Sequence, residues 1–334
     1  MSDFAFPFPV LVADIGGTNV RFALREAPGA PLGEVVHLKT GDFAGLVEAG
    51  EQAISQIGER PRSVIACGAG PVVGRSLKLT NAPWVIDGPD VAKRLSLGQG
   101  LLLNDFEAQA LSLPTIPQDW ARQIGPLRFG VPGPQVILGP GTGLGIGALV
   151  EAGGRHTPLA SEACHIGFGP ATDEEWALWP HLERAHGRIT TESVISGPGL
   201  VRVHRARMAA AGVTPPDIDG PGLVAAATAD PEGPEALSLD LFWRIVGRFA
   251  GDMAVAFVAF GGVTLAGGVL PRLVDFLDED AFRAAFEAKA PVEALAKRIP
   301  TRLVMQSDSV LVGMAAIATR PSAYAIDYPV RGWV

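Results

Sequence analysis

Two glycine-rich turns are the first residues of this chain whose types and spacing suit chemistry. Asp14 stands just before Gly16-Gly17-Thr18-Asn19, and Gly141-Thr142-Gly143 forms the second turn. Glycine lets main-chain N–H groups face an anion with no side chain in the way, and a threonine hydroxyl adds one more donor. One such turn is more often structural than functional. Two of them, each with a threonine, favour phosphate binding.

Asp14 ends an apolar run, where a carboxylate can hold a magnesium ion or its water shell against triphosphate oxygens. The alternative is an Asx turn in which the side chain caps its own backbone. The chain has no G-x-x-x-x-G-K-[ST] sequence and no protein-kinase signature. Any phosphoryl transfer must therefore use a different architecture.

Asn104-Asp105 is the best catalytic candidate, because it follows the apolar run Leu101–Leu103 and precedes a helical stretch from Phe106. A carboxylate at a strand exit can accept a hydroxyl proton while the neighbouring amide orients the substrate. The alternative is an N-cap for the helix, which Asp or Asn fits well. The two readings are evenly matched on these residues alone.

The elements that must position these residues can be read from periodicity and turn signals. Predicted strands are Val10–Ala13, Arg21–Leu24, Ser63–Cys67, Leu77–Leu79, Leu101–Leu103, Val136–Leu138, Ile146–Val150 and Val263–Ala266. Predicted helices cover residues 44–58, Phe106–Leu111, Leu239–Phe260 and Val310–Thr319, with a loop and a short helix at Ala209–Glu235. Pro114–Pro134 is rich in breakers and is interpreted as a connection at a lobe boundary.

A dinucleotide-binding oxidoreductase is a rival interpretation, because Gly143–Ala148 loosely matches G-x-G-x-x-[GA]. That pattern should open a crossover helix. Ile146–Val150 is instead apolar and prone to form a strand. A helix there would favour the oxidoreductase, and a strand would exclude it.

Length, composition and net charge limit the possible fold classes and binding partners. The chain has 334 residues, 48% of them apolar and 19% charged, which favours two folded lobes over disorder. Its net charge of −8 argues against nucleic acid or an anionic membrane as partner.

Cys67 and Cys164 are too few for a disulfide framework, and an acid near the start opposes a secretory signal, so a cytoplasmic protein is expected. The uncharged stretch Met253–Pro271 is broken by paired glycines and predicts a buried helix followed by a central strand.

Six motifs occur in the order seen in bacterial glucokinases, and the chain resembles that family from residue 10 to about 316. The motifs are Val12-Ala13-Asp14-Ile15-Gly16-Gly17-Thr18-Asn19, Leu79-Thr80-Asn81-Ala82-Pro83-Trp84, Asn104-Asp105-Phe106, Leu138-Gly139-Pro140-Gly141-Thr142-Gly143-Leu144-Gly145, Glu162-Ala163-Cys164-His165 and Ile195-Ser196-Gly197-Pro198-Gly199-Leu200. The resemblance implies an α/β, two-lobed actin-like ATPase (ribonuclease H-like) sugar kinase fold with an interlobe cleft. Residues 1–115 plus 307–334 would form the small lobe and residues 116–306 the large lobe.

The resemblance also implies the reaction, which is ATP- and magnesium-dependent phosphorylation of glucose at its 6-hydroxyl. Asp105 looks like the general base and Asn104 like a ligand of the sugar ring. The implied ligands of the other hydroxyls are Glu162, His165 and Glu192. The implied nucleotide and magnesium residues are Asp14 (through water), Gly16, Gly17, Thr18, Asn19, Gly141, Thr142, Gly143, Gly267 and Gly268, the last two in the adenosine segment. Dimers are frequent among relatives, so a homodimer is expected.

The chain departs from the family pattern beside the sugar residues. The family usually has Glu-Gly-Gly-His where this chain has Ala163 and Cys164 between the acid and the histidine, and an acid is common at Gly167. Side chains added there would narrow the sugar pocket and shift specificity, which leaves a kinase for another hexose as one alternative. A sugar-binding regulator with weak catalysis on the same fold is a second alternative, and the intact Asp105 and the two glycine-rich turns speak against it. The Cys-rich zinc motif of the related repressor/ORF/kinase family is missing, so no structural zinc is expected.

Overall fold

The computed structural model describes residues 4–126 and 131–333, and its contacts divide the chain into two compact units. The first unit holds the residues up to Pro117, Leu149–Leu159 and the residues from Asp308 onward, and the second holds Gln118–Ala148 and Ala160–Ser307. This division differs from the expected lobes in placing residues 149–159 with the first unit. The lobe boundaries near residues 115 and 307 remain a prediction. Residues 127–130 of the expected connection, and residues 1–3 of the N-terminal segment used to argue against a signal peptide, lie outside the described residues.

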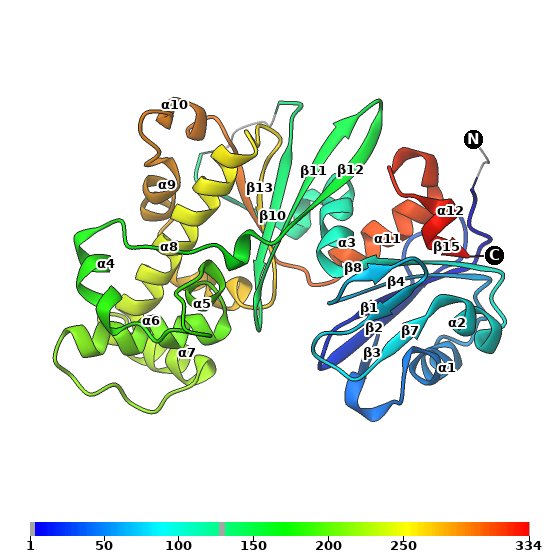
Figure 1. The fold of residues 1–334 in the computed structure, drawn as a ribbon, viewed down its shortest axis with the longest axis horizontal. Helices are drawn as coiled ribbons and strands as arrows, with labels where there is room; N and C mark the ends of the chain where they lie inside the picture. Colours follow the sequence, from blue (N-terminus) through cyan, green and yellow to red (C-terminus); the bar gives the residue numbers. More distant parts are fainter. Residues whose placement is uncertain (1–3, 127–130, 334) are drawn as a thin grey trace. The chain divides into compact units, whose positions relative to one another are not determined.

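A six-stranded sheet forms the centre of the first unit (Figure 1). Its strands in spatial order are β15 (Gly332–Trp333), β8 (Gln99–Asn104), β4 (Ser63–Gly68), β1 (Val10–Ile15), β2 (Asn19–Arg25) and β3 (Val36–Lys39). β8, β4 and β1 are parallel, whereas β2 and β3 continue as antiparallel neighbours. Both faces of β1 are covered, which explains why Val10–Ala13 is apolar throughout rather than alternating.

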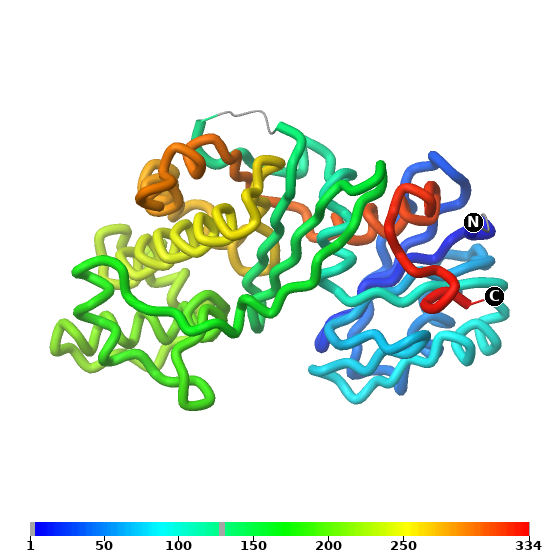
Figure 2. The backbone as a smooth tube through the Cα atoms, turned by 45° about the horizontal axis from the view of Figure 1, so that its top comes forward, coloured from blue at the N-terminus to red at the C-terminus, as the bar shows by residue number. Residues whose placement is uncertain are grey.

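Helices cover both faces of this sheet, with α3 and α11 on one side and α1 and α2 on the other (Figure 1). The helices are α1 (Leu46–Ile57), α2 (Gly88–Leu95), α3 (Asp105–Ser112), α11 (Ser309–Thr319) and α12 (Tyr328–Arg331). A small sheet adds β5 (Val72–Val73), β6 (Ser76–Lys78) and β7 (Val85–Asp87). Helix α11 packs on β1 although almost 300 residues separate them, as the red and blue tube segments show (Figure 2). The C-terminal segment is therefore an integral part of the first unit.

The second unit contains most of another six-stranded sheet, of which residues 149–159 are grouped with the first unit. Its order is β12 (Arg155–Ser161), β11 (Leu144–Ala152), β10 (Gln135–Pro140), β13 (Gly262–Leu265), β14 (Thr301–Val304) and β9 (Ala121–Ile124). Strand β11 confirms the predicted strand at Ile146–Val150, so the oxidoreductase interpretation is wrong. Strand β9 was not predicted: it lies inside the supposed connection Pro114–Pro134, has only four residues, and is defined by antiparallel pairing with distant β14.

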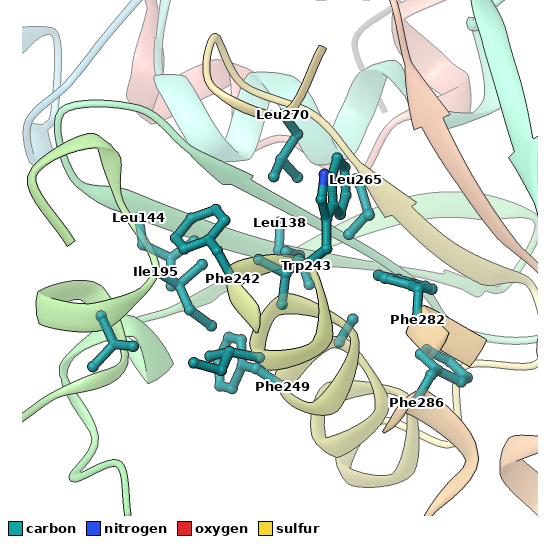
Figure 3. Packing of buried hydrophobic residues seen from close by; sticks show 14 of the residues in the cluster. Leu138, Leu144, Ile195, Phe242, Trp243, Phe249, Leu265, Leu270, Phe282 and Phe286 are labelled. Carbon is teal, nitrogen blue, oxygen red and sulfur yellow. The ribbon is translucent and has the colours of Figure 1, made fainter. Parts of the chain in front are cut away.

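The core of the second unit surrounds helix α8 (Pro234–Ala256) (Figure 3). Phe242, Trp243 and Phe249 are almost wholly buried, and the Trp243 Nε1 donates to the Leu273 carbonyl at 2.9 Å. The helix begins five residues before the predicted Leu239, because Gly233-Pro234 provides an N-cap and a first-turn proline. The remaining helices are α4 (Asp173–Leu178), α5 (Thr191–Val194), α6 (Gly197–Ala210), α7 (Gly220–Ala229), α9 (Glu279–Glu287) and α10 (Glu293–Ala296).

Short 3-10 turns connect these elements at η1 (Thr40–Asp42), η2 (Leu113–Thr115), η3 (Gln118–Trp120), η4 (Ala163–His165), η5 (Trp179–His181), η6 (Leu270–Phe276) and η7 (Pro321–Ala323). The stretch Met253–Pro271 contains the end of α8 and the central strand β13, as predicted. Over the described residues, every helix is too short or too polar to cross a bilayer.

Candidate active site

The predicted site residues fall into two groups, one within each unit. In the first unit, the carboxyl ends of β1, β4 and β8 meet at one edge of the sheet. The strand register places Asp14 beside Cys67, and Gly68 beside Asn104. This is the edge at which open α/β sheets bind ligands. Asp14, the first glycine-rich turn and the Asn104-Asp105 pair therefore belong to one site.

Asn104 is the N-cap of α3, the alternative that its sequence position left open. Its Oδ1 accepts hydrogen bonds from the main-chain N–H of Phe106 at 3.0 Å and of Glu107 at 3.2 Å, and its Nδ2 donates to the Gly70 carbonyl at 3.1 Å. An amide nitrogen carries two hydrogens. The cap thus fixes the side chain, which also forms a hydrogen bond with the Asp105 carboxylate.

Asp105 is the first residue of α3 and is held by the strand–helix junction that Asn104 caps. Burial raises the pKa of Asp105 to about 6, and the nearby charge of Asp14 adds to this rise. A carboxylate with such a pKa takes up a proton more readily than an exposed one and is still mostly ionised at neutral pH. These are the properties of a general base.

Asp14 is held on both of its oxygens. Oδ2 forms an ion pair with Arg21, and Oδ1 accepts a hydrogen bond from the Cys67 thiol at 3.3 Å. Burial, followed by the charges of Asp14 and Asp105, raises the pKa of Cys67 far enough to keep the thiol protonated as a donor. Arg21 also pairs with Asp308 at 3.0 Å. A magnesium ion therefore fits Asp14 better through its water shell than by direct ligation.

Arg21 was missed in the sequence, although a signal for it was present. A tight hairpin across Gly16–Asn19 pairs Asp14 with Arg21 directly across the two strands. Opposite charges at such cross-strand positions attract. The predicted hairpin therefore already contained the partner of the predicted carboxylate.

The first glycine-rich turn is held by hydrogen bonds within the turn and from Thr40, and its tip is exposed to solvent. The Gly16 N–H donates to the Asn19 carbonyl at 2.9 Å. Thr40 holds the turn through its hydroxyl, which donates to the Gly16 carbonyl at 2.8 Å, and through its N–H, which donates to the Thr18 carbonyl at 2.9 Å. Gly17, Thr18 and Asn19 are exposed. The turn is thus rigid and accessible, as binding of an anion requires.

Arg331, in the C-terminal segment, braces the junction that carries Asp105. Its guanidinium binds both carboxylate oxygens of Glu107 at 2.6 and 2.7 Å and also donates to the Leu102 carbonyl at 2.9 Å. Glu107 completes the capping box by accepting from the Asn104 N–H at 3.3 Å. No local pattern could reveal this chain of contacts, because Glu107 and Arg331 are 224 residues apart.

The second group begins at the turn between β10 and β11. The Gly141 N–H donates to the Gly143 carbonyl at 2.7 Å, and the Gly197 N–H donates to the Gly141 carbonyl at 2.8 Å, which joins the turn to the start of α6. Thr142 is exposed. A Cβ on Gly143 would lie 2.4 Å from Oε2 of Glu192, the oxygen that accepts from the Leu144 N–H at 2.9 Å. A side chain at position 143 would therefore displace the Glu192 carboxylate from the Leu144 N–H, a reason for glycine that is independent of anion binding.

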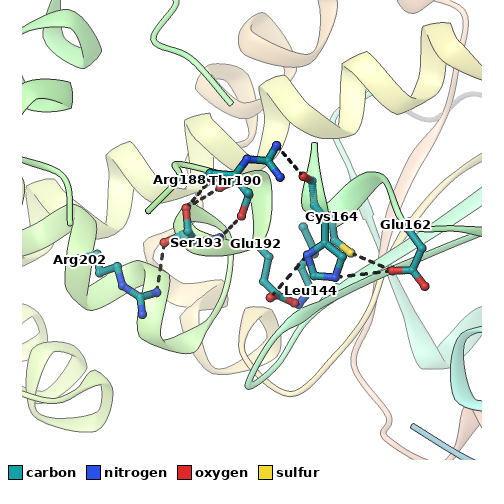
Figure 4. Close-up of polar contacts among 9 residues, drawn as sticks. Leu144, Glu162, Cys164, Arg188, Thr190, Glu192, Ser193 and Arg202 are labelled. Atoms are coloured by element: carbon teal, nitrogen blue, oxygen red, sulfur yellow. Dashed lines mark hydrogen bonds and ion pairs between the residues drawn. The ribbon is translucent and has the colours of Figure 1, made fainter. Parts of the chain in front are cut away.

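Glu162, His165 and Glu192 lie together beside this turn (Figure 4). His165 Nε2 is 3.6 Å from Oε2 of Glu162, and its Nδ1 is 3.9 Å from Oε1 of Glu192. Glu192 lies in the first turn of α5, whose cap is a reciprocal pair of hydrogen bonds between Thr190 and Ser193. The half-exposed imidazole thus stands between two carboxylates, an arrangement suited to a ligand with several hydroxyl groups.

Cys164 is one of the residues at which this segment departs from the pattern of the bacterial glucokinases. Its side chain is buried and packs with the core of the second unit, while its thiol lies 3.8 Å from Oε2 of Glu162. Burial, and then the charges of Glu192 and Glu162, raise the pKa of Cys164 to about 12. The thiol is therefore protonated at neutral pH.

Gly267 and Gly268 follow strand β13 and lie next to a cavity. Gly267 has φ +82°, and a Cβ there would lie 2.5 Å from the Pro140 carbonyl oxygen, so the position requires glycine on both grounds. The cavity measures about 730 Å³ and is lined in part by Gly197, Arg202 and Val269. A cavity of this size fits a drug-sized ligand. Its arginines were not predicted as site residues.

Comparisons with known proteins identify the family of this chain. A family model described as Glucokinase matches residues 11–321. The chain is 40% identical over 333 residues to a glucokinase of Sinorhizobium fredii, covering 99% of this chain and 98% of that protein. It is similar in structure, with a TM-score of 0.84 and 30% identity, to a glucokinase from an Antarctic psychrotroph, covering 94% of this chain and 99% of the other.

A glucokinase of Balamuthia mandrillaris, solved in complex with glucose, has the same fold with a TM-score of 0.76 at 20% identity, over 92% of this chain and 93% of that one. The strands, the capped Asn104-Asp105 junction and the two glycine-rich turns thus lie in an α/β, two-lobed actin-like sugar kinase fold. Since the family match spans almost the whole chain and the curated relative is 40% identical over its full length, this chain belongs to the glucokinase family.

Proposed function

We propose that this chain transfers the γ-phosphoryl group of ATP to the 6-hydroxyl of glucose, which yields glucose 6-phosphate and ADP and admits glucose to glycolysis. The observation that carries the proposal is the position and environment of Asp105. It is fixed at a capped strand–helix junction, at the sheet edge that also holds Asp14 and the first glycine-rich turn. Its pKa of about 6 suits a base that works at neutral pH.

In this mechanism Asp105 accepts the proton of the 6-hydroxyl as its oxygen attacks the γ-phosphorus in line. Asn104 would contact the sugar ring through its side-chain amide, which the helix cap holds in place, and would keep the ring oriented. Phosphoryl transfer depends mainly on positioning and on neutralising charge, so Asp105 need not be a strong base. Asp14 would hold magnesium through water, and when bound the ion neutralises charge on the phosphate oxygens.

The other nucleotide contacts would come from the two glycine-rich turns and from the cavity beside Gly267-Gly268. Main-chain N–H groups of Gly16–Asn19 and Gly141–Gly143 would face phosphate oxygens. The apolar part of the cavity, with Val269 next to the paired glycines, would take the adenosine. Arg202 also lines the cavity, where it pairs with Glu183 at 3.5 Å, and it could turn to a phosphate of the bound nucleotide.

Sugar recognition would fall to Glu162, His165 and Glu192. Each can accept a hydrogen bond from a hydroxyl, and the imidazole can also donate one. A site built from such groups rejects a sugar that leaves one of them unpaired. The Cys164 side chain is 4% exposed, so it takes little space from a sugar bound at the exposed Glu162 and His165, which supports glucose as the substrate. We also propose that the protein acts in the cytoplasm as a homodimer.

The test is the rate of ADP release from Mg-ATP with glucose, mannose, fructose or no sugar. We expect rapid turnover with glucose and little without sugar, because the hydroxyl of glucose is a better placed acceptor than water. Turnover with another hexose alone would assign specificity to Ala163 and Cys164 and refute the glucose assignment. Absence of turnover, with glucose binding still detected by calorimetry, would favour a sugar-binding regulator.

A further inference from the structure

We propose that Glu162, Cys164 and His165 form a reversible binding site for a thiophilic divalent metal ion such as Zn²⁺, and that the metal competes there with the sugar. The competition rests on the proposed function, because Glu162 and His165 are also the proposed sugar ligands. The metal site itself rests on the geometry of three side chains in one short turn, η4 and the residue before it.

The three ligand atoms are spaced almost as a zinc ion requires. Bonds of about 2.0 Å to oxygen or nitrogen and about 2.3 Å to sulfur place two ligands of a tetrahedral zinc ion roughly 3.3–3.6 Å apart. Here Oε2 of Glu162 is 3.6 Å from Nε2 of His165 and 3.8 Å from Sγ of Cys164. All three ligand atoms lie within 4.8 Å of one another. Binding of a metal ion would require the three side chains to move slightly closer together.

His165 has a carboxylate near each of its two ring nitrogens, and Glu192 would have to move closer than 3.9 Å to accept a hydrogen bond from Nδ1. Nε2 faces Glu162, while Nδ1 faces Oε1 of Glu192 at 3.9 Å. Metal-binding histidines typically donate their other ring N–H to a carboxylate, which fixes the ring and makes it a better ligand. Glu192 is itself fixed, because its other oxygen accepts from the Leu144 N–H (Figure 4). This second observation is independent of the spacing of the three ligands.

The charges near the thiol favour a cation. Oε2 of Glu162 lies 3.8 Å from the Cys164 sulfur, and Glu192 lies on the other side of His165, so two carboxylates stand close to the three ligands. On binding, the metal–sulfur bond forms as the S–H bond breaks, and the proton passes to solvent. The carboxylates that disfavour a lone thiolate would then be neutralised by the ion. Three protein ligands leave a fourth position for water, as in exchangeable sites rather than closed structural ones.

Cobalt(II) without nucleotide is the direct probe, because its spectrum reports sulfur ligation and tetrahedral geometry whether or not the protein is active. We expect about one equivalent of Co²⁺ to produce a sulfur-to-cobalt charge-transfer band and visible bands typical of tetrahedral cobalt. Cys164→Ser should lose the charge-transfer band. His181→Asn, which changes an exposed histidine outside the site, should keep it. A wild-type protein without this band, or an equal band in Cys164→Ser, would overturn the metal site.

Addition of glucose separates the metal proposal from the sugar assignment. Glucose should abolish the cobalt bands, and Zn²⁺ held at a set free concentration by a metal buffer should raise the apparent KM for glucose while leaving kcat unchanged. That inhibition should weaken in Cys164→Ser. Bands that persist at saturating glucose would overturn the competition and the sugar role of Glu162 and His165, and would leave the metal site standing.

Discussion

Asp105→Asn is expected to lower kcat about 10²- to 10⁴-fold, the usual contribution of a general base. Asparagine has the same shape and can also begin a helix, so α3 and its cap at Asn104 should persist. It cannot accept the hydroxyl proton. Glucose binding, measured by calorimetry, should therefore change far less than turnover.

The matched control is Asp90→Asn, which alters an exposed acid in the first turn of another helix, α2. It should retain wild-type turnover. The pH profile adds a second readout, because the wild-type rate should fall as the pH drops through about 6 and Asp105 becomes protonated. The residual rate of Asp105→Asn should lack this step. A kcat near the wild-type value would refute the role of Asp105.

Trp333→Ala is expected to reduce the free energy of unfolding of the first unit by about 3–5 kcal/mol, as for other large aromatic side chains removed from a core. Trp333 is 2% exposed, and its ring fills the space over Gly100, where a Cβ would lie 2.2 Å from it. Its strand, β15, pairs with β8, which leads to Asn104. Removal of the ring should therefore also release Arg331 from Glu107.

Urea unfolding followed by circular dichroism, together with hydrogen exchange of the β8 amides, measures this effect. The amides of β8 report on the first unit alone. Trp176→Ala is the control, because Trp176 is 63% exposed and its loss should change stability by no more than about 0.5 kcal/mol. Trp333→Phe should recover part of the loss. Equal unfolding midpoints for Trp333→Ala and wild type would show that the C-terminal segment does not stabilise the sheet.

Local pattern was sufficient where an element and its role are encoded within a few residues. The apolar run Val10–Ala13 followed by glycines predicts the β1–β2 hairpin, and Leu101–Leu103 before Asn104-Asp105 predicts the strand–helix junction. The strand propensity of Ile146–Val150 was enough to exclude a crossover helix. Glu162, His165 and Glu192 came from the family resemblance and not from their own pattern.

Local sequence patterns could not predict contacts between residues that are distant in the chain. Strand β9 exists because β14, nearly 180 residues later, supplies its hydrogen-bonding partner. Gly143 leaves room for the Glu192 carboxylate, which approaches it from another element. Arg331 supports Glu107 only after β15 has joined the sheet. Each of these features depends on the tertiary fold, which cannot be read from local patterns in a single sequence.

The position of the transferred phosphate tests the central claim most directly. Wild-type protein is incubated with Mg-ATP and glucose, and the sugar product is analysed by phosphorus–proton correlation NMR. The account predicts one sugar phosphate whose phosphorus couples to the two protons on carbon 6 of glucose, and its formation should stop in Asp105→Asn. Phosphate on another carbon, or ADP formed without a sugar phosphate, would contradict it.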